Sequence, residues 1–212
     1  MKYPKIDSIF KRDERGRFIF GDYSRPEFEI LANNQWEFTE KLEGMNMRVW
    51  YTTAYDANSM TFLGRTDNAQ IPGPLLQVMG NEIFSIGKMS DVFSSDAILF
   101  GEGVGPRIQK GKHGFTEYDF ILFDVYVFDA NGGGCWLKRE SVVDIANDLS
   151  LAIAPNMGYG NLADAISIAE RGFNSHFGNF AAEGLVLRPV GDFLDRFGQR
   201  IITKVKTSDF NA

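Results

Sequence analysis

The sequence predicts an α+β fold in which strands dominate and helices are inserted between them. Strand-like stretches occur both in hairpins and singly, and they do not alternate regularly with helices as they do in a parallel βαβ protein. The 212 residues are 44% hydrophobic and 24% charged, a composition typical of globular proteins. No repeat, low-complexity tract or linker divides the sequence, so we expect a single domain over residues 1–212.

The first half of the chain is expected to hold short strands and one hairpin. Residues 1–35 carry mixed charge and several turn formers, and we expect short strands or loops there. Residues 46–53 alternate between apolar and polar side chains, which indicates a strand, and residues 60–65 form the return strand after a turn at 56–59. Apolar residues recur at helical spacing over 75–84 and predict a helix.

The second half is expected to add strands and two further helices. Buried strands are predicted at 97–100, at 118–129, at 185–190 and at 201–206. One helix is predicted around residues 142–149. Another begins after Asn161, because Asp164 three residues later resembles an acidic capping box, and it runs through Arg171.

Charge and cysteine content exclude several classes of protein. A net charge of −6 argues against a general nucleic-acid coat but leaves room for a local basic groove. The single cysteine, Cys135, cannot form an internal disulfide and fits a reducing compartment. Two histidines leave little room for a histidine-based metal site or a Ser-His-Asp triad. We expect a cytoplasmic protein, with no membrane partner.

The last predicted strand places two lysines on one face. Lys204 and Lys206 are two residues apart, so the period of a strand aligns them with Ile202. One interpretation is a solvated sheet edge, which lysines commonly protect. The other is a pair of cations that binds a polyphosphate.

Two carboxylates stand at unusual positions in predicted strands. Glu183 precedes Gly184 where a strand begins, which permits close approach of backbone or ligand but also fits an ordinary turn. Asp124 follows Phe123 inside a long apolar strand. Because a lone buried charge is costly, Asp124 must face water, a partner or a ligand.

Lys41 lies between two acidic residues, Glu40 and Glu43, and three positions before Gly44. This setting suits a lysine held near phosphate as a nucleophile, although a lysine and glycine at this spacing also arise by chance.

The order of these motifs resembles the motif series of the covalent nucleotidyltransferase superfamily, which contains ATP-dependent DNA and RNA ligases and mRNA capping enzymes. The motifs are Lys41-x-x-Gly44, Gly64-Arg65-Thr66, Gly101-Glu102, Phe123-Asp124, Glu183-Gly-x-Val-x-Arg188 and Lys204-x-Lys206. The sequence is most similar to the phage Rnl2-type RNA ligases, whose first motif also reads Glu-Lys-x-x-Gly-x-Asn and which carry a stretch like residues 101–110. The resemblance covers about residues 36 to 210.

The resemblance implies two antiparallel sheets flanked by helices, with an ATP-binding cleft, and a three-step reaction. Lys41 would attack the α-phosphate of ATP to form lysyl–AMP, AMP would pass to an RNA 5′-phosphate, and a 3′-hydroxyl would displace it. ATP and Mg²⁺ or Mn²⁺ are the implied cofactors, and RNA ends, including those of a nicked duplex, are the implied partners. The protein is expected to be monomeric and encoded by a phage.

The resemblance also assigns roles to individual residues. Phe123 would stack on adenine and Glu102 would hold the ribose. Asn46 and Arg65 would orient phosphates, and Glu40 would sit near the base, with Leu42 and Glu43 lining the nucleotide site. Lys204 and Lys206 would neutralise the triphosphate, and Glu183 with Asp124 would hold the metal or its waters.

The chain departs from the resemblance in two respects. Glu43 stands where the family has Asp or His, and no OB fold or C-terminal accessory domain is expected. Substrate contact would then fall to basic residues whose alternative is plain surface charge, namely Arg107, Lys110, Lys112 and Arg188.

The leading hypothesis is an ATP-dependent RNA ligase. The alternatives are an ATP-dependent DNA ligase or another polynucleotide adenylyltransferase, and a non-sealing module that binds nucleotides or RNA ends. The presence of Lys41, Glu183, Lys204 and Lys206 argues against the non-sealing module.

Overall fold

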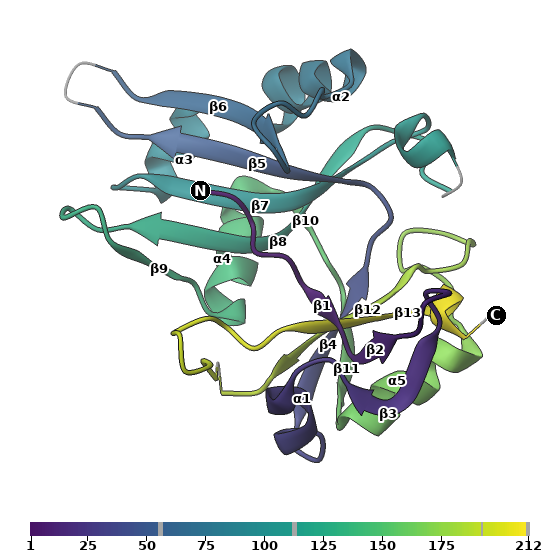
Figure 1. The fold of residues 1–212 in the computed structure, drawn as a ribbon. Coiled ribbons are helices and arrows are strands. Elements are labelled where there is room, and N and C mark those ends of the chain that lie inside the picture. The colour runs from purple at the N-terminus through teal and green to yellow at the C-terminus, as the bar shows by residue number, and fades with distance from the viewer. Residues whose placement is uncertain (55–56, 112–113, 192, 211–212) are drawn as a thin grey trace. The chain divides into compact units, whose positions relative to one another are not determined.

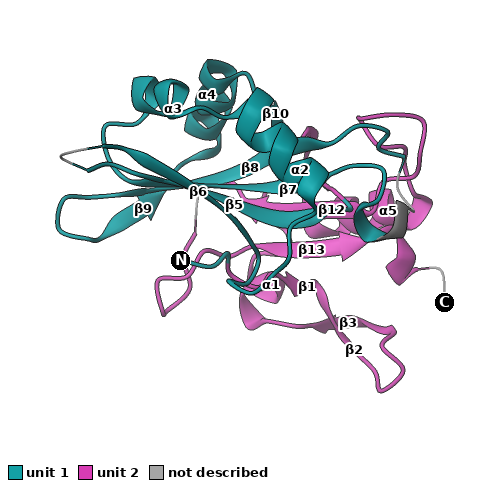
Figure 2. Ribbon diagram, turned by 90° about the horizontal axis from the view of Figure 1, so that it is seen from above, with its two compact units in different colours: residues 1–3, 43–153 teal, residues 4–42, 154–212 magenta. Residues whose placement is uncertain are grey.

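The chain folds into two compact units, distinguished by colour in Figure 2. Unit 1 comprises residues 1–3 and 43–153, and unit 2 comprises residues 4–42 and 154–212. The computed structural model describes residues 1–54, 57–111, 114–191 and 193–210, and the side chains of residues 110 and 111 lie outside this description. Helices and mostly antiparallel strands occur in both units, which confirms the α+β prediction (Figure 1).

Unit 1 is built on a mostly antiparallel sheet. Its strands are ordered β10 (Ala152–Ile153), β8 (Asp119–Phe128), β7 (Ala97–Val104), β5 (Met45–Thr52) and β6 (Ser59–Gly64), and β9 (Gly134–Trp136) also pairs with β8. Only β10 is parallel to its neighbour among the described strands of this sheet. The predicted hairpin is confirmed as β5 and β6, although part of its turn lies outside the described residues.

Helices cover one face of this sheet, as Figure 2 shows. They are α2 (Gly73–Val78), a π-helical turn η1 (Met79–Ile83), α3 (Ile86–Val92) and α4 (Arg139–Leu149). The helix predicted over 75–84 is therefore α2 continued by a π turn that contains Gly80. Met47, Leu99 and Val125 turn toward the helices and form the core with them, because alternate residues of a strand share a face.

Unit 2 contains a second sheet and a separate two-stranded hairpin. The sheet is ordered β1 (Asp7–Ser8), β13 (Thr203–Lys206), β12 (Gly184–Pro189), β4 (Trp36–Lys41) and β11 (Asn156–Gly160). All its pairs are antiparallel except that of β1 with β13. The hairpin joins β2 (Phe10–Arg12) and β3 (Phe18–Tyr23), so the short strands expected in residues 1–35 are confirmed.

Two helices complete unit 2, with a short 3-10 turn, η3 (Thr207–Asp209), near the end of the described chain. Helix α5 (Leu162–Arg171) begins with the predicted capping box, in which Asn161 Oδ1 accepts from the Asp164 N–H and Asp164 Oδ2 accepts from the Asn161 N–H. Helix α1 (Pro26–Ile30) was not predicted. Its apolar content is a single buried residue, Phe28, which is too little for a periodic signal.

Three hairpin turns have the same sequence pattern, Asp-x-x-Gly-x, and the same hydrogen bonds. They begin at Asp13, Asp129 and Asp195. In each turn, the aspartate Oδ1 accepts from the N–H groups two and four residues later, at donor–acceptor distances of 2.7–3.1 Å. The glycines, residues 16, 132 and 198, have φ of 79°, 81° and 73°, a region that favours glycine. The repeated turn fixes which residue lies at each hairpin tip.

None of the helices in the described part of the chain is long and apolar enough to cross a membrane.

Candidate active site

Lys41 is the last residue of strand β4, and its side chain is partly buried. The sequence predicted the strand that follows Lys41, over residues 46–53, but not the strand that contains it. Strand β4 ends at Lys41, and residues 42–44 separate it from β5. Trp36 and Phe38 face the core of unit 2, so Thr39 and Lys41 lie on alternate, polar positions of the strand. The break after Lys41 places the lysine at a strand end.

Strand register brings Lys41 close to the two C-terminal motifs. Gly184 on β12 pairs with Lys41 on one side and with Lys206 on the other. Gly184 has φ of +155°, and a Cβ there would lie 2.1 Å from the carbonyl oxygen of Val205. Only glycine fits this position without displacing backbone, which explains the glycine after Glu183.

Glu183 bridges the two lysines. Its Oε2 is 2.5 Å from Lys41 Nζ and its Oε1 is 2.6 Å from Lys206 Nζ. The exposed fractions of the side chains are 21% for Lys41, 14% for Glu183 and 34% for Lys206, so water screens these contacts less than it screens surface ion pairs. Two ammonium groups and one carboxylate carry a net charge of +1. The cluster is therefore able to attract an anion such as a phosphate.

The remaining predicted residues of unit 2 lie around this cluster. Lys204 and Lys206 alternate with the buried Thr203 and Val205, so the predicted shared face of the lysines is confirmed. Glu40 lies on the opposite side of β4 from Lys41 and is 3% exposed, and its Oε2 accepts from the His176 backbone N–H at 2.9 Å. Leu42 is buried beyond the end of the strand.

Four predicted residues of unit 1 lie on the sheet face opposite its helices, namely Asn46, Glu102, Phe123 and Asp124. Asn46 on β5 is directly opposite Glu102 on β7. Both alternate with residues that face the core, namely Met47 and Gly103. Asn46 Oδ1 is buried, and it has no hydrogen-bond partner among the described residues. An orphaned buried acceptor is rare, and it indicates a place where a ligand donor fits.

A β-bulge places Phe123 and Asp124 on that same face. The pairing of β7 with β8 runs from Phe100 opposite Asp124 to Gly101 opposite Leu122, so Phe123 is the extra residue. Phe120 and Leu122 face the core before the bulge and Val125 faces it afterwards, which leaves two consecutive residues turned away from the core.

Tyr3 contacts both residues of the bulge. Its hydroxyl donates to Asp124 Oδ2 at 2.8 Å, and its ring meets that of Phe123 edge-on with centroids 5.1 Å apart. Asp124 is fully buried, and a buried carboxylate needs hydrogen-bond partners. The Tyr3 hydroxyl is one of them. The sequence did not single out Tyr3, because one aromatic residue near the terminus carries no pattern.

The residues that follow Lys41 are held by close backbone contacts within unit 1. A Cβ on Gly44 would lie 2.6 Å from the Gly103 carbonyl oxygen, so the motif needs glycine here. The Gly44 carbonyl accepts from Gln109 Nε2 at 2.9 Å, and Gln109 itself has φ of 50°. Glu43 is half-buried, at the start of unit 1.

Arg65 and the other basic candidates lie mostly at the surface. Arg65 is exposed just after β6, in a turn held by the buried Arg48, whose guanidinium donates to the Gly64 carbonyl and to Asp67. Arg107 is exposed and Arg188 is half-buried. Lys112 and the side chain of Lys110 lie outside the described residues. The sequence predicted Arg48 only as a residue of a strand. Its burial was not predicted, because a sequence pattern does not reveal that a charged side chain is buried.

Carboxylates and histidines do not gather into a metal site by themselves. Within the described part of the chain, no three or more His, Cys, Asp or Glu residues form such a group. Glu183 belongs to unit 2 and Asp124 to unit 1. The structure thus sorts the predicted residues into a lysine-rich set on unit 2 and a set with Asn46, Glu102 and the bulge on unit 1.

A family model described as RNA ligase matches residues 34–206, which is most of the chain and spans every motif named above. The chain belongs to the RNA ligase family. Membership confirms the resemblance at this level, whereas the Rnl2-type subgroup stays a prediction.

Solved structures of a Naegleria gruberi RNA ligase have a similar fold. An apo point variant is 20% identical over 98% of this chain and 62% of that chain, with a TM-score of 0.65. A variant with ATP and Mn is 18% identical over 99% of this chain and 58% of its own, with a TM-score of 0.66. A complex with PPi is 20% identical over 98% of this chain and 62% of its own, with a TM-score of 0.62. This chain therefore spans about three fifths of those proteins, and at such identity the likeness concerns the fold.

Proposed function

We propose that this chain is an ATP-dependent RNA ligase that joins 3′-hydroxyl and 5′-phosphate RNA ends through an AMP group attached to Lys41. The observation that carries the proposal is the bridge from Lys41 through Glu183 to Lys206 in a chain of the RNA ligase family. Structures of the Naegleria ligase with ATP and Mn and with PPi add support for the choice of nucleotide and metal.

Lys41 acts as the nucleophile in the first step. As an ammonium its nitrogen has no lone pair, so it must give up a proton before it attacks the α-phosphorus of ATP. Glu183 Oε2, 2.5 Å from Lys41 Nζ, is the acceptor already in contact. A nitrogen–phosphorus bond then forms, and the bond from the α-phosphorus to the bridging oxygen breaks as pyrophosphate leaves.

Lys206 and Lys204 stabilise charge on the phosphates. Charge that develops on phosphate oxygens is best stabilised by cations already held in place, and the bridge to Glu183 holds Lys206. Lys204 lies on the same face of β13, one strand period away.

The unit 1 residues supply recognition of the nucleotide. The bulge turns Phe123 away from the core, where an aromatic ring is able to stack on adenine. Glu102 would accept from ribose hydroxyls, while Asn46 and Arg65 would orient the phosphates. Glu40, Leu42 and Glu43, which flank the nucleophile, would position its surroundings.

The carboxylates fit a hard cation held mainly by substrate. Mg²⁺ and Mn²⁺ favour oxygen ligands, and Mg²⁺ in particular keeps several waters and binds through one or two carboxylates plus phosphates. Glu183, with Asp124 acting directly or through water, would hold such an ion, which would neutralise phosphate charge.

Further assignments belong to the proposal. Both units act together as one adenylyltransferase domain over residues 1–212, and the chain functions as a monomer on RNA ends in the cytoplasm. Arg107, Arg188, Lys110 and Lys112 contribute contacts to the RNA backbone.

The decisive experiment is incubation with α-labelled ATP and Mg²⁺ or Mn²⁺, followed by denaturation. We expect label to stay on the protein, and Lys41→Ala to abolish it, since alanine has no nucleophile. Lys11→Ala, which removes an exposed lysine paired with Asp22, is the matched control and should label normally.

Sealing is then measured on nicked RNA, nicked DNA and single-stranded ends. Failure of the wild-type protein to form an adduct with ATP would refute the proposal. Labelling by GTP alone would instead favour capping chemistry, and sealing of DNA alone would overturn the choice of RNA.

A further inference from the structure

The hairpin between β12 and β13, residues 190–200, presents apolar side chains to solvent. Phe193 is 42% exposed, Leu194 58% and Phe197 72%. Exposed phenylalanine side chains are not stabilised by burial in the core. Where exposed apolar side chains gather on a surface, they mark a place of contact with another molecule. Residue 192 lies outside the described residues.

The hairpin holds its tip in a defined conformation. Asp195 starts one of the three Asp-x-x-Gly-x turns, and its Oδ1 accepts from the N–H groups of Phe197 at 2.8 Å and Gln199 at 2.9 Å. Leu194 and Arg200 form a bridge across the hairpin below the turn. A side chain on such a tip loses little freedom when it binds, which favours binding.

Residues 190–200 contain two arginines and two aspartates, so their own formal charges cancel, and arginines from outside the hairpin add positive charge. The guanidinium of Arg25 donates to Asp195 Oδ2 at 2.8 Å, so this carboxylate already has a cationic partner. The guanidinium of Arg196 lies over the Phe197 ring, 4.6 Å from its centroid. The tip therefore combines a flat aromatic surface with a cation in direct contact.

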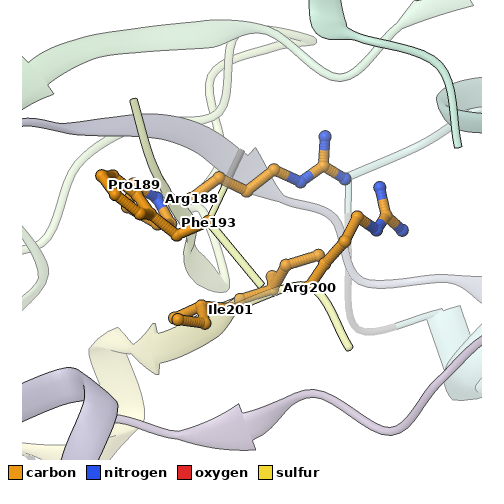
Figure 3. Close-up of a pocket in the computed structure, with 6 residues that line it drawn as sticks. Arg188, Pro189, Phe193, Arg200 and Ile201 are labelled. Carbon is orange, nitrogen blue, oxygen red and sulfur yellow. The ribbon is translucent and has the colours of Figure 1, made fainter. Parts of the chain in front are cut away.

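A second pair of cations lies at the base of the hairpin. Figure 3 shows the side chains of Arg188 and Arg200 extending in the same direction beside Phe193. The pocket that they line encloses only about 10 Å³, roughly the space of one water molecule. A nucleotide base does not fit inside it, so binding would take place on the outer surface of the hairpin.

We propose that this hairpin binds an unpaired nucleotide of the RNA substrate, with its base stacked on Phe197 and its phosphates facing Arg196 and Arg200. This inference rests on the proposed function. Exposed aromatic rings interleaved with cations suit single-stranded nucleic acid, because every base has a face that stacks and every linkage is an anion. A chain of net charge −6 attracts RNA only where cations are gathered in this way.

The test measures binding of a fluorescently labelled single-stranded RNA oligomer to the intact chain without ATP, by anisotropy. Loss of one stacked base costs about 1–3 kcal/mol, so Phe197→Ala should raise Kd about 5- to 150-fold. Phe197→Trp should restore binding, because indole stacks at least as well. For a blunt, fully paired RNA duplex, Phe197→Ala should leave Kd unchanged.

Arg15→Ala is the matched control. Arg15 occupies the same place in the turn that starts at Asp13 as Phe197 occupies in its own turn, and it is exposed. Its removal takes away a surface cation without removing a stacking surface, so Kd should change by less than about 2-fold.

Two results would overturn the inference. One is an unchanged Kd for single-stranded RNA in Phe197→Ala, and the other is an equal loss on the blunt duplex. Label transfer from ATP is measured in parallel and should be the same in Phe197→Ala and wild type. If the wild-type protein takes no label while Phe197→Ala still weakens RNA binding, the proposed ligase activity fails and the RNA site stands.

Discussion

At the scale of single residues, the position of one glycine determines whether the lysine cluster forms. Gly184 lies between Lys41 and Lys206 in the sheet, and its missing side chain lets β12 and β13 approach. Glu183, the preceding residue, contacts the ammonium groups of both Lys41 and Lys206. The net positive charge of the cluster results from all three groups together, one carboxylate and two ammonium groups.

Gly184→Ala should therefore damage both stability and activity. Its Cβ would collide with the Val205 carbonyl, and its φ of +155° is strained for alanine, so we expect a loss of at least about 2 kcal/mol in the free energy of unfolding. Urea unfolding checks the loss, and the yield of labelled protein should fall with it.

Gly87→Ala provides the comparison for this substitution. Gly87 lies in α3, and nothing lies within 4 Å of a Cβ placed there. Alanine should be neutral or stabilising by about 0.5–1 kcal/mol, because it has the better helix propensity. Equal effects of the two substitutions would contradict the steric explanation.

At the scale of elements, the repeated Asp-x-x-Gly-x turn links sequence to hairpin geometry. The Gln199 N–H hydrogen bond, followed by those from Phe197 and Arg25, holds the pKa of Asp195 below its ordinary value, against the opposing effect of desolvation. The pKa of Asp13 is lowered in the same way, first by the Arg17 N–H. The ionised carboxylate is thus the form that maintains the turns at Asp195 and Asp13.

The Asp195 carboxyl should titrate with a midpoint below 3.8, the ordinary value for aspartate. Because the folded pKa is depressed, the turn is stabilised at any pH above that ordinary value, and the stabilisation is lost as pH falls through the folded pKa. Carbon-detected NMR titration of side-chain carboxyls measures it. A midpoint at or above 3.8 would show that the turn hydrogen bonds do not favour the anion.

Asp119, at the start of β8, offers the opposite case. Burial raises its pKa, and the Phe120 N–H counteracts this only in part. The same titration should therefore place Asp119 above 3.8 and Asp195 below it. The order of the two midpoints provides an internal reference.

At the scale of the whole molecule, each unit carries part of the residue set that we propose binds ATP. Unit 2 holds Lys41, Glu183 and Lys206, and unit 1 holds Asn46, Glu102 and the bulge at Phe123. The chain passes from one unit to the other directly after Leu42, one residue beyond the proposed nucleophile Lys41. Binding of ATP should therefore depend on residues of both units.

ATP with Mg²⁺ should raise the melting temperature of the protein. At 100 times Kd, a ligand that binds only the folded state adds about 2.7 kcal/mol, which corresponds to a rise of about 5–10 °C for a chain of this size. Pyrophosphate in excess keeps the covalent step reversible in this assay.

Glu102→Ala and Lys206→Ala should each reduce that rise, and Lys11→Ala should not. Differential scanning calorimetry with and without nucleotide measures all four proteins. A full rise in both active-site variants would rule out these residues as nucleotide ligands.

The sequence by itself determined the class of fold, several strands and the order of the motifs, but not β4, the strand that ends at Lys41. The alternation of apolar and polar residues predicted β5, β6 and β13. The pair Asn161 and Asp164 predicted the start of α5. These signals are local in the chain. Residues 1–35 were harder to interpret, since short strands and α1 depend on partners distant in the sequence. Family membership agrees with the motif order.

Only the tertiary structure decided which of those residues meet. A strict period of two places Phe123 and Asp124 on opposite faces, and the bulge, set by pairing with β7, places them on one. Glu183 reaches Lys41 because β12 lies between β4 and β13, an order that no local pattern encodes. Local propensity selects the elements, whereas strand order and register, which depend on long-range packing, place the side chains that do chemistry.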